Sequence, residues 1–197
     1  MRGKWGDLPS ESKILKINVT SSQQKTNKNR LAFSPMTEIE GKYKGYYCFE
    51  NYWQGGKVYE GIDPKISKEW WLKQTTGKRR YPMGKSKKVL YGIYDGKKYN
   101  YIDARKNVYV PEYHSLIHSS KKSNSALKDL IDKYNNGVDI AIYDFDGPRS
   151  NDSSPICELL TIDLLREKIN NPIYPFGHGY VVAASIAGYD INEYTQY

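Results

Sequence analysis

Twelve consecutive residues carry the most information in this chain: Cys48-Phe49-Glu50-Asn51-Tyr52-Trp53-Gln54-Gly55-Gly56-Lys57-Val58-Tyr59. On a helix, four of their side chains fall at i, i+3, i+4 and i+7 and share one face: Glu50, Trp53, Gln54 and Lys57. A core-facing side would not combine a carboxylate, an amide and an ammonium, and a solvent-facing side would rarely include an indole. The spacing therefore predicts a helix from Cys48 to Tyr59 that lines a polar pocket with an aromatic wall. It is equally typical of an amphipathic surface helix with one buried tryptophan.

The length favours one globular domain, and several helical segments around a few short β-branched runs predict a mainly helical α+β fold with a small β-sheet. The chain has 197 residues, of which 39% are apolar, and its 19 tyrosines and 4 tryptophans supply large surfaces to bury. We expect residues 1–30 to form an N-terminal strand and a flexible loop, and residues 31–197 to form the main domain. The β-branched runs Ile14–Val19 and Asp139–Tyr143 are expected in the sheet. Asp95-Gly96 between two β-rich runs predicts a hairpin.

Several classes of protein are disfavoured by what the sequence lacks. No run of about 18 apolar residues is present, so we expect no membrane span. The first twelve residues contain no apolar segment typical of a secretory signal, which favours a cytoplasmic protein. Cys48 and Cys157 lie too far apart in sequence to suggest a metal motif, and His114 and His118 have no partner ligands in a zinc pattern. We therefore expect neither a metal nor a cofactor.

The formal net charge of +8 favours a phosphate-bearing or polyanionic partner. The densest basic stretch begins at Gly77-Lys78-Arg79-Arg80. Glycine frees the backbone there, and arginine binds phosphate oxygens through two nitrogens, so this stretch is a candidate phosphate clamp. A solvated basic loop is the alternative interpretation.

Two further stretches carry polar groups next to glycines. The strand that ends at Tyr143 is followed by Asp144 and Asp146, a position where active-site carboxylates often lie, although the spacing alone favours an Asp-rich turn. Phe176-Gly177-His178-Gly179 opens the last long helix. A Gly-X-Gly entry can offer backbone N–H groups to an anion, or can simply allow close packing.

In this order, the motifs resemble those of YbiA-like proteins, the NADAR superfamily. Glu50, Gln54 and Lys57 match the E-H-x-Y-Q-A-x-K helix of that family, with Trp53 in its aromatic position. Looser matches, spread over residues 31–188, are Phe33-Ser34-Pro35, Gly77-Lys78-Arg79, the strand before Asp144 and Asp146, and Phe176-Gly177-His178-Gly179. The chain departs from the family at Asn51, where the family has histidine, at Phe176, where it has tryptophan, and in the hairpin around Asp95-Gly96, which resembles an insertion.

The resemblance implies an α+β YbiA-like fold and an N-glycosidase. Members of the family cleave phosphoribosyl-aminopyrimidines or remove ADP-ribose from guanine in nucleic acid. An oxocarbenium-like transition state at ribose C1 needs a nearby carboxylate. Glu50 is the first candidate and Asp144 or Asp146 the second, with His178 as proton donor to the leaving base. The remaining candidates would bind the substrate: Trp53, Gln54, Lys57, Lys78, Arg79, Arg80, Phe33, Phe176, Gly177 and Gly179.

Two other functions stay open at this point. The departures at Asn51 and Phe176 are compatible with a catalytically silent module that holds a nucleotide or ADP-ribose. A basic protein that binds DNA or RNA without a small-molecule pocket would explain the charge, but it would give no role to Glu50 or to the paired aspartates. The oligomeric state cannot be read from the sequence.

Overall fold

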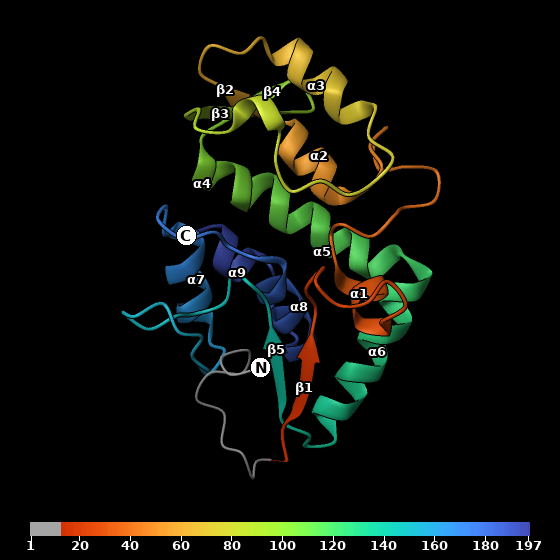
Figure 1. The fold of residues 1–197 in the computed structure, drawn as a ribbon. Helices are drawn as coiled ribbons and strands as arrows, with labels where there is room; N and C mark the ends of the chain where they lie inside the picture. The colour runs from red at the N-terminus through yellow and green to blue at the C-terminus, as the bar shows by residue number, and fades with distance from the viewer. Residues whose placement is uncertain (1–12) are drawn as a thin grey trace. The chain divides into compact units, whose positions relative to one another are not determined.

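The computed structural model describes residues 13–197, and it has the α+β architecture expected from the sequence (Figure 1). The strands are β1 (Leu15–Asn18), β2 (Lys57–Tyr59), β3 (Val89–Tyr94), β4 (Lys97–Tyr99) and β5 (Ile140–Tyr143). The α-helices are α1 (Lys28–Phe33), α2 (Phe49–Gly55), α3 (Pro64–Leu72), α4 (Tyr101–Ala104), α5 (Val110–Ser119), α6 (Lys121–Asn135), α7 (Ile162–Asn170), α8 (His178–Ala187) and α9 (Asn192–Thr195). A short 3-10 helix, η1 (Pro82–Gly84), and a π-helix, η2 (Arg105–Tyr109), complete the set.

The contacts divide these residues into two compact units. The terminal unit consists of residues 13–34 and 110–197, and the central unit consists of residues 35–109. Residues 13–30, which lie within the stretch expected to form an N-terminal strand and flexible loop, belong to the same compact unit as residues 110–197. None of the helices within residues 13–197 is long and apolar enough to cross a membrane.

The terminal unit is built on the expected pair of β-branched strands. β1 and β5 pair in parallel, with Leu15 opposite Ile140 and Asn18 opposite Tyr143, and they lie side by side in Figure 1. Beside them, α8 is apolar on nearly every side, and Val181 and Val182 are fully buried. α5 and α6 hold the end of α1, because the Tyr113 hydroxyl donates to the Phe33 carbonyl and the Ser123 hydroxyl donates to the Ala32 carbonyl, the latter at 2.6 Å. These bonds satisfy carbonyls that the short helix leaves open.

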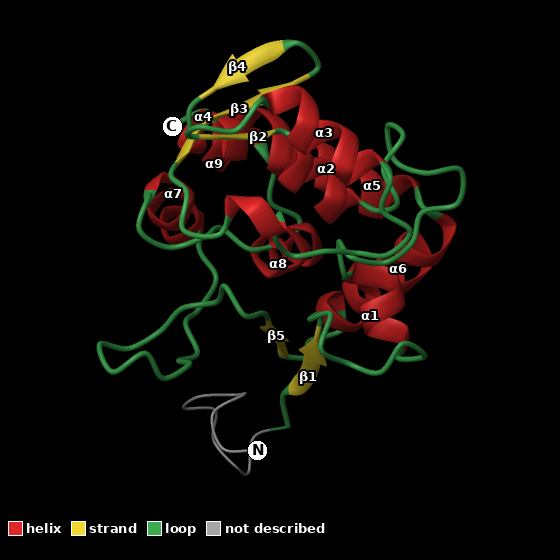
Figure 2. Cartoon of the chain, turned by 45° about the horizontal axis from the view of Figure 1, so that its top comes forward, coloured by secondary structure: helices red, strands yellow, loops and turns green. Residues whose placement is uncertain are grey.

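In the central unit α2 packs against α3, and an antiparallel sheet of order β2-β3-β4 contacts α2 through Tyr94. The hairpin predicted at Asp95-Gly96 is confirmed: both residues have positive φ (49° and 78°), as a tight two-residue turn requires, and Figure 2 shows β3 and β4 as adjacent strands. The core of this unit is aromatic. Tyr94 of β3 lies against α2, where its ring stacks on Trp53 at 5.2 Å between centroids.

The predicted helix from Cys48 to Tyr59 is wrong in its second half. α2 ends at Gly55, and the chain then turns into β2, which starts at Lys57 and pairs with β3. Glycine disfavours a helix by roughly 1 kcal/mol relative to alanine, so the Gly55-Gly56 pair is a weak place to continue one. Close packing also requires glycine here, because a Cβ on Gly56 would lie 2.2 Å from a ring carbon of Tyr94.

Candidate functional site

The predicted site residues fall into two groups, one on each unit. In the central unit lie Glu50, Trp53, Gln54, Lys57, Lys78, Arg79 and Arg80. In the terminal unit lie Phe33, Asp144, Asp146, Phe176, Gly177, His178 and Gly179. Each group is therefore described within its own unit.

In the central unit, Glu50 lies in the first turn of α2 and is half-buried. Its backbone N–H donates to the Pro35 carbonyl at 2.8 Å, which fixes the start of the helix. One turn later, the Gln54 amide donates to Glu50 Oε1 at 2.8 Å. The two side chains therefore form the polar face that the i, i+4 spacing predicted, and the amide sets the orientation of the carboxylate.

The other two members of the predicted face lie differently. Trp53 is only 7% exposed, with Tyr94 stacked on its ring and Tyr109 at 5.0 Å between centroids. The ring face that Tyr94 covers is not open to a ligand. Lys57 belongs to β2 rather than to the helix, but its ammonium still lies 5.6 Å from the centre of the Trp53 ring. A cation at this distance contributes a cation–π attraction.

Asn51 joins α2 to the basic loop, which is a connection that sequence reasoning missed. The side chain is fully buried; its Nδ2 donates to the Thr76 carbonyl at 3.0 Å, and its Oδ1 accepts from the Lys78 N–H at 2.8 Å. The loop is also pressed against Met36, since a Cβ on Gly77 would lie 2.8 Å from the Met36 carbonyl oxygen. The backbone at residues 76–78 is thus fixed beside the helix that carries Glu50.

Beyond that anchored backbone, the side chains of Lys78, Arg79 and Arg80 are exposed. Asn51 therefore holds the backbone from which these three cations extend, and such cations can bind phosphate. The residue before Asn51 on α2 is Glu50, the candidate carboxylate. The sequence carried one signal for this contact between α2 and the basic loop. The asparagine side chain has both a hydrogen-bond donor and an acceptor, so it can bond a backbone carbonyl and a backbone N–H at once. Nothing in the spacing, however, identified Thr76 and Lys78 as its partners.

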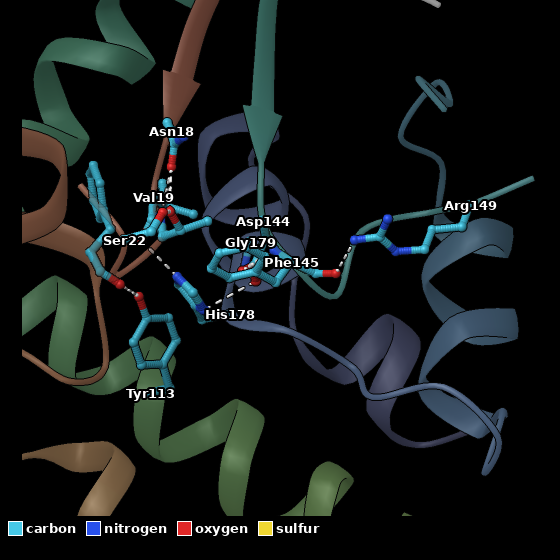
Figure 3. Close-up of polar contacts among 11 residues, drawn as sticks. Asn18, Val19, Ser22, Tyr113, Asp144, Phe145, Arg149, His178 and Gly179 are labelled. Atoms are coloured by element: carbon cyan, nitrogen blue, oxygen red, sulfur yellow. Dashed lines mark hydrogen bonds and ion pairs between the residues drawn. The ribbon is translucent and has the colours of Figure 1, made fainter. Parts of the chain in front are cut away.

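In the terminal unit, the paired acids and the Gly-His-Gly motif come together. Figure 3 shows His178 lying between the end of β1 and Asp144 at the end of β5. Its Nδ1 lies 3.0 Å from Asp144 Oδ2, and its Nε2 lies 2.9 Å from the Val19 carbonyl oxygen. Because both neighbours of the ring are acceptors, the imidazole donates most favourably from both nitrogens, as its protonated form does.

The pKa shifts of this pair follow from the same contacts. Burial by itself would lower the pKa of His178, but the Asp144 carboxylate and the Val19 carbonyl outweigh it and raise that pKa above its ordinary value. Burial would likewise raise the pKa of Asp144, yet His178 and the N–H groups of Gly179 and Phe145 together lower it. The pair is therefore held as a buried ion pair that ties β1, β5 and the start of α8 together.

The Gly-X-Gly entry to α8 is occupied by a side chain of the protein itself. The Gly179 N–H donates to Asp144 Oδ2 at 2.9 Å. A Cβ on Gly177 would lie 2.4 Å from the same oxygen and 2.7 Å from the Cβ of Asp146, so glycine is required there for close approach. Phe33 and Phe176 are buried, the latter stacked on Tyr180 at 4.9 Å between ring centroids. The anion at this helix start is thus Asp144.

A cavity of about 450 Å³ lies beside β5 and α8, entirely within the terminal unit. Its walls are mainly apolar and include residues 155–160 of the loop before α7, with Asp144 and Gly179 at its border. Ile156, Leu159 and Leu160 give that loop an apolar character. Among residues 13–197, no three His, Cys, Asp or Glu side chains gather closely enough to hold a metal ion.

Comparison with known proteins adds no assignment: no family model, no curated protein and no solved structure matches the chain.

Proposed function

We propose that the protein hydrolyses the N-glycosidic bond of an ADP-ribosylated base or of a related phosphoribosyl nucleotide, with Glu50 as the catalytic carboxylate. The observation that supports this most is the pair of hydrogen bonds from Asn51 to the backbone of residues 76 and 78. They hold the start of a loop with three exposed cations against the helix of Glu50. Phosphates bound by these cations would bring the attached ribose to the same side of the central unit.

Hydrolysis of an N-glycosidic bond requires a water molecule and a carboxylate close to ribose C1. The bond between ribose C1 and the base nitrogen breaks while a water oxygen bonds to C1, and the departing nitrogen takes up a proton from solvent. Positive charge develops on the ribose in the transition state, and a carboxylate beneath C1 stabilises that charge and accepts a proton from the attacking water. Glu50 is half-buried and its carboxylate accepts a hydrogen bond from Gln54, so it is suited to this role.

Asp144 is less suited to it, because it is buried and already satisfied by His178 and two backbone N–H groups. Proton donation by His178 to the leaving base stays a prediction. Both ring nitrogens already have an acceptor within 3.0 Å in the terminal unit, so His178 would have to give up one of these contacts to donate to a base. The resemblance of Glu50, Gln54 and Lys57 to the helix of the NADAR superfamily supports the same assignment.

A silent module that binds ADP-ribose is the second candidate, and one observation favours it. Asn51 stands where the NADAR superfamily has histidine. Its amide nitrogen and oxygen both bond the backbone of the basic loop, so the side chain is not positioned to act on a substrate. The experiment that separates the two incubates the protein with an ADP-ribosylated DNA oligonucleotide, free ADP-ribose and unmodified DNA. Release of ADP-ribose from the oligonucleotide supports the hydrolase, whereas retention of ADP-ribose without release supports the module and rejects the hydrolase.

A further inference from the structure

The chain's positive charge is concentrated in one short part of the central unit. Residues 77–98 contain eight Lys or Arg residues and one acidic residue, a net charge of +7 out of +8 for the whole chain. All eight are exposed: Lys78, Arg79, Arg80, Lys85, Lys87, Lys88, Lys97 and Lys98. The other residues together sum to only +1, so this segment makes the largest contribution to the net charge, and it is the first candidate to attract a polyanion.

The hairpin gives the segment a defined geometry. Lys87 and Lys88 lead directly into β3, and Lys97 and Lys98 form most of β4, which pairs with β3 (Figure 2). A six-residue strand is about 20 Å long, so the two lysine pairs mark the two ends of a basic ribbon of that length. Lys98 is further fixed by its ammonium, which lies 3.9 Å from the centre of the Tyr91 ring.

The single acid of the segment does not interrupt this ribbon. Asp95 in the hairpin turn is 2.7 Å from the ammonium of Lys44, so its charge is balanced by a residue from outside the segment. Alternate residues of a strand share a face, and Val89, Tyr91 and Ile93 lie opposite the face of Tyr94, which is buried against α2. The outward face of β3 therefore combines modest apolar surface with the lysines at its ends and on β4.

We propose that this hairpin, residues 85–98, is a docking surface for the phosphate backbone of a nucleic acid. Several cations along an extended ribbon suit a partner whose charges are evenly spaced along a strand. An anionic membrane fits less well, because the hairpin has no Trp or Phe and neither tyrosine stands free to enter a bilayer: Tyr94 is buried, and the Lys98 ammonium lies over the ring of Tyr91. The surface is separate from Glu50 and from the three cations at residues 78–80, and it does not require that the protein be a hydrolase.

The test measures binding of the full chain to fluorescein-labelled DNA and RNA oligonucleotides of about 20 nucleotides by fluorescence anisotropy, between about 50 and 200 mM salt. One variant replaces Lys87, Lys88, Lys97 and Lys98 with alanine. A control with the same loss of charge replaces four exposed lysines of α3 and α6, namely Lys65, Lys68, Lys121 and Lys122.

The hairpin variant is expected to bind about a hundredfold more weakly at low salt. Its plot of log affinity against log salt should become shallower by about 3, since each lost phosphate contact removes roughly 0.7–0.9 of slope. The control variant should stay within a few fold of the wild type. Equal weakening of both variants would overturn the proposal, as would absent binding by the wild type. Binding of the wild type to phosphatidylserine vesicles but not to the oligonucleotides would overturn it in favour of a membrane.

Discussion

Replacement of Asn51 by alanine tests how the basic loop is held. The change deletes two hydrogen bonds, of 3.0 Å to the Thr76 carbonyl and of 2.8 Å to the Lys78 N–H. Each is worth about 1 kcal/mol net, which gives a loss of roughly 2 kcal/mol in the free energy of unfolding.

For a chain of this size, each kcal/mol lowers Tm by about 2–4 °C, so the Asn51→Ala variant should melt roughly 4–8 °C below the wild type. Differential scanning fluorimetry and urea denaturation measure this directly. Asn135→Ala is the matched control, because Asn135 is exposed at the end of α6 and should change stability by less than about 0.5 kcal/mol. If Asn51→Ala melts no earlier than Asn135→Ala, the anchoring role of Asn51 is wrong.

Three further predictions concern the charged and the close-packed residues. Replacement of Arg79 and Arg80 with alanine should weaken ADP-ribose binding, measured by calorimetry, and leave Tm nearly unchanged, since exposed charges contribute little to folding; unchanged affinity would reject the phosphate clamp. The folded pKa of His178 is raised above 6.5, so its contribution to stability is fully present below pH 6.5 and is lost as pH rises through the folded pKa. The stability difference between wild type and His178→Gln should therefore shrink above pH 6.5, and a constant or growing difference in urea denaturation would contradict the ion pair. Gly177→Ala should cost about 1–3 kcal/mol by crowding Asp144, and a neutral result would argue against that close contact.

The sequence predicted the parts of the fold that depend on local pattern. The β-branched runs at Ile14–Val19 and Asp139–Tyr143 did become paired strands, and Asp95-Gly96 did form a tight hairpin turn. The end of α2 was missed because Lys57 continued the i, i+7 pattern by coincidence. Its strand is set by pairing with β3, more than thirty residues further along the chain, which periodicity does not reveal.

The candidate site was predictable in its members but not in its contacts. Asp144 and His178 were both singled out by their positions at a strand end and a helix start, and they do meet. The second bond of His178, to the Val19 carbonyl, depends on where β1 ends, because Val19 follows β1 and is 159 residues earlier in the chain than His178. The stacking of Tyr94 on Trp53 is likewise a product of the β3 pairing, so the sequence showed an aromatic wall but not which ring would cover it.

The most direct test of the central claim is the turnover of the Glu50→Gln variant on an ADP-ribosylated oligonucleotide. Glutamine keeps the shape of the side chain and removes its charge, so the loss should fall on the transition state. We expect kcat to fall by orders of magnitude while substrate binding stays roughly intact. A Lys57→Met control measures the effect of removing a neighbouring charge beside Trp53 without touching Glu50. A Glu50→Gln variant that releases ADP-ribose as fast as the wild type would contradict the assignment of Glu50 as the catalytic carboxylate.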